Sequence, residues 1–320
     1  MPSKRLSDVP KPWFLPVWSN AVRPFGWSSV LITFLALGEW LAKGTPAPFD
    51  QEKTVVMAES GGFLTTGRPK SWQDCLTRQL RSGADICMTL DYPIKARRSG
   101  KGIEEQIYSL SEKEKETLLE WNIENVRQEV KWKGWFTSNY EIDFQLCAVI
   151  QGWDLKSTEV CAKEYAALDL DCFALGAVST DASARARNLT TALNTVVRAR
   201  EIIGKDRWLH LLGVTQFEFL WLVKPYITSF DSATSLIDPA FGNLMLPNGE
   251  HAGFHHGEFI DPRLVKYDIW KDGALNKPLM DLSPDDVDYH KAQEVYFKNY
   301  VSYLKQYFWS YSEGVQEVLA

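Results

Sequence analysis

The chain has 320 residues, of which 45% are hydrophobic and 24% charged, and its formal net charge is −6. This composition is typical of a folded globular protein, and the negative balance excludes a protein that coats nucleic acid through bulk positive charge. Thirteen Trp, 12 Tyr and 16 Phe provide enough aromatic surface for a large core. The length suits one large domain, and we expect a single domain over residues 1–320.

The cysteines and histidines give no sign of a metal site. The five cysteines are odd in number and form no CxxC pair, so we expect buried, reduced thiols in a cytoplasmic protein. His251, His255 and His256 cluster in a glycine-rich stretch without a nearby cysteine, and we expect loop histidines there. The start of the chain lacks the features of a signal peptide. The apolar segment 30–37 is too short to span a membrane, so we expect it in the core and no membrane partner.

Short apolar runs alternate with amphipathic stretches along the chain. The apolar runs predict strands at residues 14–17, 54–58, 84–90, 144–150, 171–175 and 208–212. The apolar run from Trp221 to Phe230 predicts one more strand, which delivers Asp231. Helices are predicted at residues 71–82, 111–133, 157–168 and 182–203. The second of these begins with a capping box formed by Ser111 and Glu114.

This alternation predicts a parallel α/β fold. A doubly wound sheet would carry a glycine-rich phosphate fingerprint after its first strand, and the chain contains neither GxGxxG nor a Walker sequence. The sequence therefore favours a (β/α)8 TIM-type barrel.

Polar groups or glycine follow five of the expected strands, at Glu59, Asp91, Gln151, Gly176 and Asp231. In a barrel these positions converge on one face. Carboxylates, an amide and exposed backbone suit a flat heterocycle that forms hydrogen bonds, together with a carboxylate nucleophile. No histidine or cysteine stands at these strand ends, which argues against Ser–His or Cys–His hydrolysis. An aspartate that follows a strand is also a common turn or helix cap, and this alternative stays open for each one.

A basic loop follows Asp91 and carries four cations without an acidic residue among them, namely Lys95, Arg97, Arg98 and Lys101. Such a group is often a solvated surface loop. Its place directly after a strand-end aspartate favours contact with the phosphates of a nucleic acid.

The last 35 residues are predicted to form a long aromatic-rich helix or a pair of helices. The tyrosines of this segment fall at spacings of four, three, four and four along one helical face, at positions 296, 300, 303, 307 and 311. We expect this face to pack against the barrel. A homodimer interface is the alternative, because tyrosine is enriched in such interfaces.

Several short motifs occur in a characteristic order over roughly residues 54–250. They are Glu59-Ser-Gly-Gly-Phe63, Ala84-Asp-Ile-Cys-Met-Thr-Leu-Asp91, Ile150-Gln-Gly152, Leu168-Asp-Leu-Asp-Cys-Phe-Ala-Leu-Gly176, Leu211-Leu-Gly-Val214 and Ser229-Phe-Asp231. In these motifs the chain resembles the tRNA-guanine transglycosylase superfamily. The resemblance implies a (β/α)8 barrel that exchanges a guanine base in a nucleic acid for a 7-deazaguanine.

The resemblance also implies a role for each matching residue. Asp231 would be the nucleophile that attacks the anomeric carbon, and Glu59 would replace an acid–base aspartate. The base would be bound by Asp91, Gln151 and neighbouring motif residues, which are Ser60, Gly61, Gly152, Gly176 and Ala177. A carboxylate at position 91 suits the N1–H and 2-amino groups of guanine, and a glutamine with backbone amides suits its O6 atom. No cofactor is implied.

The chain departs from the family pattern at several places. Glu59 stands where the family usually has aspartate, and Ala177 stands where it usually has a second glycine. No cysteine follows Cys172, so the family's zinc site is missing, and so is the basic residue expected soon after Asp231. Those last two elements serve tRNA. The departures favour the DpdA-type branch, which places 7-deazaguanines in DNA. A zinc-free tRNA transglycosylase and an inactive nucleic-acid-binding barrel are the alternatives.

Overall fold

The computed structural model describes most of the chain and divides it into two compact units. The first unit comprises residues 1–19 and 26–232, and the second comprises residues 20–25 and 233–320. The single domain predicted from the sequence stays a prediction. The described residues are 14–18, 29–33, 36, 54–62, 71–94, 110–140, 144–176, 189–254, 261–277 and 281–309.

The first unit is built on a parallel barrel. Each strand pairs with the next in chain order, and the pairing of Leu15 with Asp231 joins the last strand to the first, so that the barrel is closed. This arrangement confirms the α/β class and the parallel barrel. The strands are β1 (Phe14–Trp18), β2 (Ser29–Ile32), β3 (Val55–Ala58), β4 (Ile86–Met88), β5 (Gln145–Ile150), β6 (Cys172–Leu175), β7 (Trp208–Leu211) and β8 (Ser229–Ser232).

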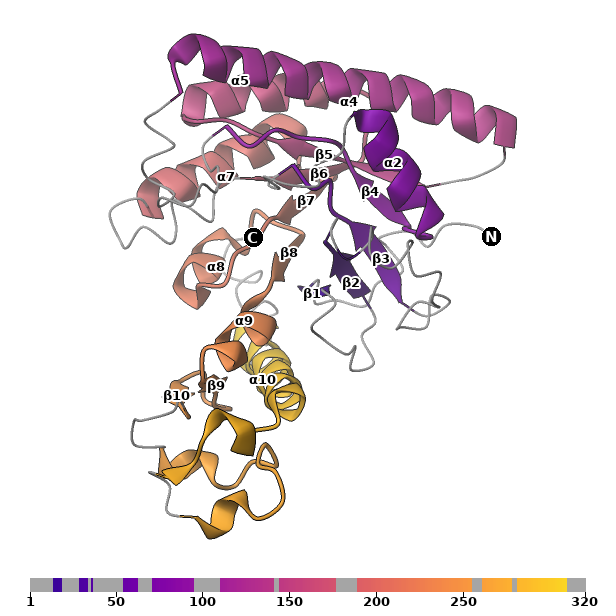
Figure 1. The fold of residues 1–320 in the computed structure, drawn as a ribbon. Coiled ribbons are helices and arrows are strands. Elements are labelled where there is room, and N and C mark those ends of the chain that lie inside the picture. The colour runs from indigo at the N-terminus through magenta and orange to yellow at the C-terminus, as the bar shows by residue number, and fades with distance from the viewer. Residues whose placement is uncertain are drawn as a thin grey trace. The chain divides into compact units, whose positions relative to one another are not determined.

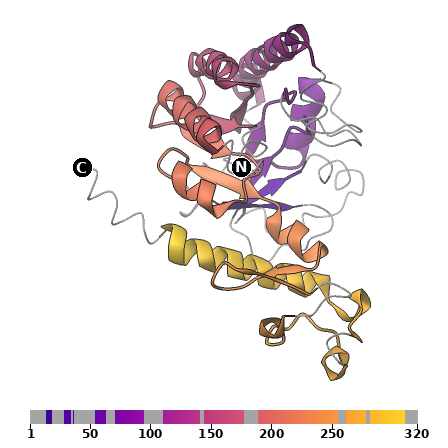
Figure 2. The ribbon, with the colours of Figure 1, turned by 90° about the vertical axis from the view of Figure 1, so that its left-hand side faces the viewer.

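Helices cover the outside of the barrel strands (Figures 1 and 2). They are α2 (Trp72–Arg81), α4 (Glu112–Tyr140), α5 (Leu155–Ala166), α7 (Leu189–Ile203) and α8 (Phe217–Val223). Helix α5 packs against both α4 and α7. Strands β3 and β6 are buried along their whole length, because one face points into the barrel and the other lies under helices. Residues 30–32 of the apolar segment are buried in β2, which confirms that they belong to the core.

The predicted strands and most helix starts are confirmed, with differences at the helix boundaries. The capping box is present, since Ser111 N–H donates to Glu114 and Glu114 N–H donates to the Ser111 hydroxyl. The helix that it opens continues to Tyr140, beyond the expected residue 133. The expected start of the next helix at Ser157 was wrong. Asp154 is its N-cap and Ser157 is the third helical residue of a capping box. Residues 182–188 of the fourth predicted helix lie outside the described residues.

The expectation of one strand from Trp221 to Phe230 was also wrong. The first part of that run ends helix α8, and β8 begins only at Ser229. The buried residues Phe219, Leu220 and Val223 have helical spacing, which alternation alone did not reveal. Pro225 carries no amide hydrogen and follows the last helical residues, so the chain leaves the helix there before it enters β8.

The second unit contains a short helix, a two-stranded antiparallel sheet and a longer helix. Helix α10 packs against α9 and β9. Tyr296 and Tyr300 of α10 are buried, and the Tyr296 hydroxyl donates to Asp238 at 2.6 Å. Its elements are α9 (Thr234–Ala240), β9 (Asn243–Met245), β10 (His251–Gly253), the 3₁₀ turns η2 (Pro262–Leu264), η3 (Ala274–Asn276) and η5 (Pro284–Asp286), α10 (Tyr289–Tyr303) and the π-helical η6 (Leu304–Trp309).

The expected loop position was wrong for His251, which lies on strand β10. His255 and His256 fall outside the described residues. All five cysteines are free and buried, as predicted. Within the described part of the chain, no helix combines the length and the apolar character that crossing a membrane requires.

Candidate active site

Asp231 lies near the carboxyl end of β8 and is buried, with an exposed fraction of 5%. Its Oδ1 atom receives two hydrogen bonds, from the Gly213 N–H at 2.9 Å and from His210 Nε2 at 3.0 Å. Its Oδ2 atom has no hydrogen-bond partner among the described residues. The carboxylate is therefore fixed through one oxygen, and the other oxygen is left for a ligand.

His210 is the site residue that the sequence analysis missed. The sequence analysis considered the strand ends, where no histidine stands, whereas His210 lies within β7 and not after it. The register pairs His210 with Ser229, so both point to the same face, and Asp231 shares that face two residues along β8. The available signal was a lone histidine inside an otherwise apolar strand.

A second carboxylate, Asp91, lies directly after β4 and is also buried. The Ser60 hydroxyl donates to Oδ1, and Gln151 Nε2 donates to Oδ2 at 2.6 Å. Ser60 and Gln151 follow β3 and β5, the two strands that flank β4 in the barrel. The structure thus brings together three of the residues that the sequence singled out.

The amide of Gln151 is oriented by Asp91, because only its nitrogen can donate to a carboxylate. Its Oε1 atom is buried and has no partner among the described residues. Gly176 lies against this amide, and a Cβ added there would stand 2.9 Å from Gln151 Cδ. A glycine at position 176 therefore leaves the room in which the Gln151 side chain sits.

The remaining predicted site residues have different surroundings. Gly61 has a φ of 75°, a left-handed conformation that favours glycine, so Ser60 is carried on a tight turn. Gly152 packs against the start of α5, where an added Cβ would be 2.6 Å from Thr158 N. Glu59 is half-buried after β3, and its carbonyl oxygen accepts from Gln79 Nε2. Ala177 and the basic loop residues lie outside the described residues, namely Lys95, Arg97, Arg98 and Lys101.

Gln79 of α2 ties two strand ends together. Its side-chain nitrogen lies within 3.0 Å of Ala58 O and 2.9 Å of Met88 O, in addition to its contact with Glu59 O. These carbonyls belong to the ends of β3 and β4. One buried amide therefore fixes the segments that carry Ser60 and Asp91.

Side chains of helix α4 form hydrogen bonds with the backbone on either side of Asp91. Asn122 exchanges two hydrogen bonds with the backbone of Tyr92, at 2.6 and 3.0 Å. Asn125 Nδ2 donates to Leu90 O, and Glu129 Oε1 accepts from Leu90 N–H at 2.9 Å. Asn122, Asn125 and Glu129 are spaced by three and four positions, which places them on one face of the helix.

Glu129 is fully buried. Burial raises the pKa of the Glu129 carboxyl well above its ordinary value, although the Leu90 N–H acts in the opposite direction. The neutral acid is therefore the favoured form. Its Oε2 atom has no partner among the described residues. A neutral group next to the Asp91 segment avoids a second buried negative charge beside that carboxylate.

Asp91 and Asp231 stand on opposite walls of the barrel. In the strand order from β1 to β8, β4 lies halfway round from β8 (Figure 1). Both side chains lie at the carboxyl ends of their strands, the end at which parallel barrels bind ligands. We therefore take the two carboxylates and their partners as one candidate active site.

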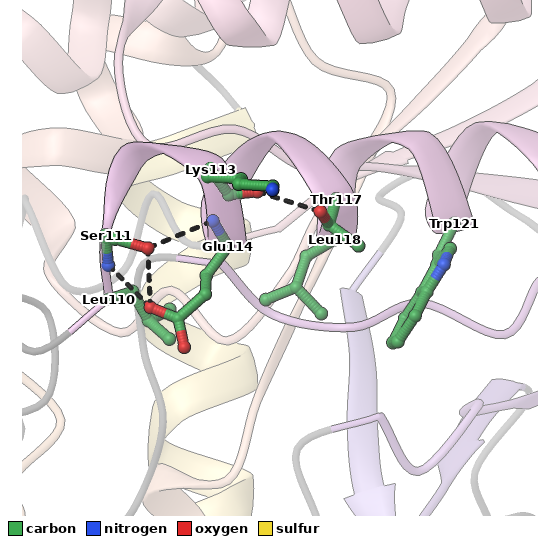
Figure 3. A pocket seen from close by; sticks show the side chains of 7 residues that line it. All are labelled: Leu110, Ser111, Lys113, Glu114, Thr117, Leu118 and Trp121. Carbon is green, nitrogen blue, oxygen red and sulfur yellow. Dashed lines mark hydrogen bonds between the residues drawn. The ribbon is translucent and has the colours of Figure 1, made fainter.

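A separate open cavity of about 330 Å³ lies along the first turns of α4 (Figure 3). Its acidic residue, Glu114, is engaged with Ser111 in the capping box, and the Thr117 hydroxyl donates to Lys113 O. Neither Asp91 nor Asp231 lines it. The lining residues are Leu110, Ser111, Lys113, Glu114, Thr117, Leu118 and Trp121. The Ser111, Glu114 and Thr117 side chains are engaged in hydrogen bonds within the helix, and we assign no chemistry to this cavity.

The described residues also lack a metal centre. No group of three or more His, Cys, Asp or Glu side chains among them is placed to hold a metal ion. The five cysteines are each buried and lie in the first unit. The residues present therefore do not fit the zinc site of the family that the sequence resembles, and no step below uses zinc.

Comparisons with known proteins do not assign the chain to a family. No family model matches it, and no curated protein matches it.

Proposed function

We propose that the chain is a base-exchange transglycosylase with a (β/α)8 TIM-type barrel. It would replace guanine in a nucleic acid, DNA in preference to tRNA, with a 7-deazaguanine such as 7-cyano-7-deazaguanine (preQ0). The observation that carries the proposal is the state of Asp231, whose carboxylate is held at Oδ1 and has no partner at Oδ2 among the described residues. A carboxylate in that state suits attack on the anomeric carbon of a nucleotide.

The proposed reaction has two displacements. In the first, a lone pair of Asp231 Oδ2 forms a bond to the anomeric carbon, and the N-glycosidic bond breaks with its electron pair moving to the guanine nitrogen. Protonation of that nitrogen gives free guanine. In the second, a deprotonated nitrogen of the incoming base attacks the same carbon, and the bond to Oδ2 breaks with its pair returning to the carboxylate. Two inversions retain the configuration of the sugar.

The Asp91 cluster suits the flat base. The hydrogen bonds that Ser60 and Gln151 give to Asp91 match in kind those of the N1–H and 2-amino groups of guanine, which are also donors. If the base replaces Gln151 at Asp91, the amide nitrogen becomes available to donate to O6. Gly176 has no side chain to hold the Gln151 amide in place, which supports such a movement.

Glu59 is the proposed proton carrier. It follows β3, next to the Ser60 that contacts Asp91, and it is half-buried. As the carboxylic acid it would deliver its proton to the outgoing guanine in the first displacement, and the resulting carboxylate would accept the proton of the incoming base in the second. The longer side chain, compared with the aspartate usual in the family, has one more methylene group with which to reach the base.

DNA is preferred by elimination, because the elements that the resembled family uses for tRNA are missing from the sequence. A base in a duplex must be flipped out or met in a single strand before the barrel can bind it. The loop residues Lys95, Arg97, Arg98 and Lys101 are the proposed contacts to the flanking phosphates. A homodimer also stays a prediction.

The decisive experiment is base exchange in vitro with purified protein, preQ0 and two substrates, a guanine-containing DNA and a tRNA anticodon stem-loop. Nucleosides released by digestion are measured by mass spectrometry. We expect the 7-deazaguanine nucleoside in the DNA, with one free guanine released for each base inserted. Insertion into the stem-loop alone would overturn the preference for DNA, and no insertion into either substrate would overturn the proposed function.

Salt dependence tests the loop. Neutralising its four cations should reduce the slope of log K against log salt by roughly 0.7 to 0.9 for each phosphate that the loop no longer neutralises. Turnover at saturating DNA should fall much less, because these side chains position the strand and do not touch the reacting bond. An unchanged slope would mean that the loop does not contact phosphates and would support the alternative of a solvated surface loop.

A further inference from the structure

A chain of hydrogen bonds runs across β7 and β8 behind Asp231. Trp208 Nε1 lies 2.7 Å from the Ser229 hydroxyl oxygen, which lies 2.7 Å from His210 Nδ1. His210 Nε2 in turn lies 3.0 Å from Asp231 Oδ1. His210 and Ser229 are 0% and 1% exposed, so neither can meet a ligand directly.

The donors in this chain fix the form of the imidazole. An indole nitrogen only donates, so Ser229 accepts from Trp208. An ionised carboxylate only accepts, so the hydrogen on His210 lies at Nε2. If Nδ1 also carried a hydrogen, the Ser229 hydroxyl hydrogen would face a donor, and Ser229 has no other acceptor among the described residues. A neutral imidazole with its hydrogen on Nε2 satisfies every group, with Nδ1 accepting from Ser229.

The arrangement differs from that of a Ser–His–Asp hydrolase. In that triad the serine contacts Nε2 and is open to the substrate, whereas the aspartate contacts Nδ1. Here the serine contacts Nδ1 and is buried under Trp208, and the aspartate is the member at the strand end. The series of hydrogen bonds therefore ends at Asp231, which makes Asp231 and not Ser229 the candidate reacting group.

We propose that His210, held in the Nε2–H form by Ser229 and Trp208, is the positioning residue that fixes Asp231 with Oδ2 toward the sugar; this inference rests on the proposed function. Together with Gly213 N–H, it keeps Oδ1 occupied throughout the reaction. When Oδ2 is bonded to the anomeric carbon, Oδ1 becomes the carbonyl oxygen of the ester, and the same two donors stay in place. They then stabilise the carboxylate as it leaves in the second displacement.

The first test separates positioning from binding. His210→Leu removes the donor, and kcat for base exchange should fall about 100-fold, as when one preorganised donor is removed, while KM for DNA changes less than about threefold. His210→Gln offers an amide N–H at a similar reach and should regain at least about tenfold of kcat over His210→Leu. His290→Leu, at an exposed histidine of α10, is the matched control and should retain wild-type kcat. Full kcat in His210→Leu would overturn the inference.

The second test does not depend on turnover. Nitrogen-15 NMR of the imidazole distinguishes the two neutral forms and the imidazolium. Wild-type protein at pH 7 should show His210 with its hydrogen on Nε2. Ser229→Ala removes the hydroxyl that donates to Nδ1 and should raise the share of imidazolium. This measurement does not require that His210→Leu folds. A hydrogen on Nδ1 in the wild type would overturn the inference. Wild type that exchanges no base but shows the Nε2–H form would overturn the proposed function and still support His210 as the group that holds Asp231.

Discussion

Asp231 and Asp91 are buried carboxylates at the strand ends of one barrel, and they are held in different ways. Asp231 is held by donors to a single oxygen, and those donors come from β7 and the turn after it. Asp91 has both oxygens engaged by side chains, and a helix grips its backbone on either side. The first arrangement leaves Oδ2 of Asp231 without a partner among the described residues, as the proposed nucleophile requires. The second gives Asp91 the exchangeable hydrogen bonds that the proposed base site requires.

The comparison teaches that the kind of support indicates the role of a carboxylate better than its burial does. Both aspartates are almost equally buried, at 5% and 6% exposure. A nucleophile needs one uncommitted oxygen with a fixed direction. A receptor for a base needs a rigid position and exchangeable hydrogen bonds. The assignment of Asp231 to the reaction and of Asp91 to base binding can be tested by substitutions that affect turnover and affinity separately.

The largest effect is expected for Asp231→Asn. The amide is nearly isosteric but a poor nucleophile, so base exchange should fall by at least about a thousandfold, while thermal unfolding changes little. Affinity for free preQ0, measured by calorimetry, should stay within about twofold, because the base is assigned to the opposite wall. Retention of a tenth of wild-type exchange, about 1.4 kcal/mol of barrier, would remove Asp231 from the nucleophile role.

Asp91→Asn should give the reverse pattern. A hydrogen bond to a charged group contributes about 1.5–3 kcal/mol, so the affinity for preQ0 should fall by about 10- to 150-fold. Single-turnover exchange at saturating preQ0 should be affected far less than in Asp231→Asn. If Asp91→Asn left the affinity of preQ0 unchanged in calorimetry, the two walls would not differ as proposed.

A smaller effect is expected where α4 grips the backbone. Asn122→Ala removes both hydrogen bonds to Tyr92 and should lower the free energy of unfolding by about 1–3 kcal/mol, as measured in urea. Asn139→Ala is a matched control on the same helix, since its side chain is exposed and, among the described residues, donates only to Trp135 O. The control should change stability by less than about 0.5 kcal/mol. Equal effects at the two positions would mean that the hydrogen bonds between Asn122 and Tyr92 add nothing to the free energy of unfolding.

The smallest effect is expected for Glu129→Gln, measured as the free energy of unfolding at low pH. The difference from the wild type should change with pH. The pKa of Glu129 is raised in the folded state by burial, whereas in the unfolded chain it is about 4.3. The folded state therefore keeps its proton when the unfolded state has lost it, and stability declines as pH rises from the unfolded pKa toward the folded one. Glutamine keeps the acceptor for Leu90 and has no proton to lose.

Urea unfolding between pH 4 and pH 8 checks this prediction. The free energy of unfolding of Glu129→Gln should fall less steeply with pH than that of the wild type, and the two should be closest near pH 4. Glu120→Gln, at an exposed position of α4, should follow the wild-type curve. A wild-type slope in Glu129→Gln would show that Glu129 is not a buried neutral acid.

Much of the fold and part of the site could be predicted from the sequence, for different physical reasons. Strands such as β3 and β5 are short apolar runs, rich in β-branched residues and bounded by turn signals, and these features predicted them. The run from Trp221 to Phe230 failed, because a short buried helix and a strand look alike when both are apolar. The strand ends at Glu59, Asp91, Gln151, Gly176 and Asp231 were predicted to converge, since parallel strands bring their carboxyl ends together.

The supports of the site were not predictable in the same way. His210 and Glu129 are polar residues inside apolar or helical stretches, and nothing local distinguishes them from residues on a surface. Their partners, Asp231 and Leu90, are 21 and 39 residues away in the chain. Only the barrel register and the packing of α4 bring these groups together. Long-range pairing of this kind leaves no local pattern.

The grip of Gln79 and α4 on the strand ends has a consequence for how such a protein can diversify. Side chains of α2 and α4 set the positions of the strand ends that carry Ser60 and Asp91, and every one of these hydrogen bonds ends on a backbone atom. They therefore do not depend on which side chains stand at the contacted positions, which are 58, 59, 88, 90 and 92. Substitutions of those side chains can alter the surroundings of Ser60 and Asp91 while the backbone that carries them stays in place.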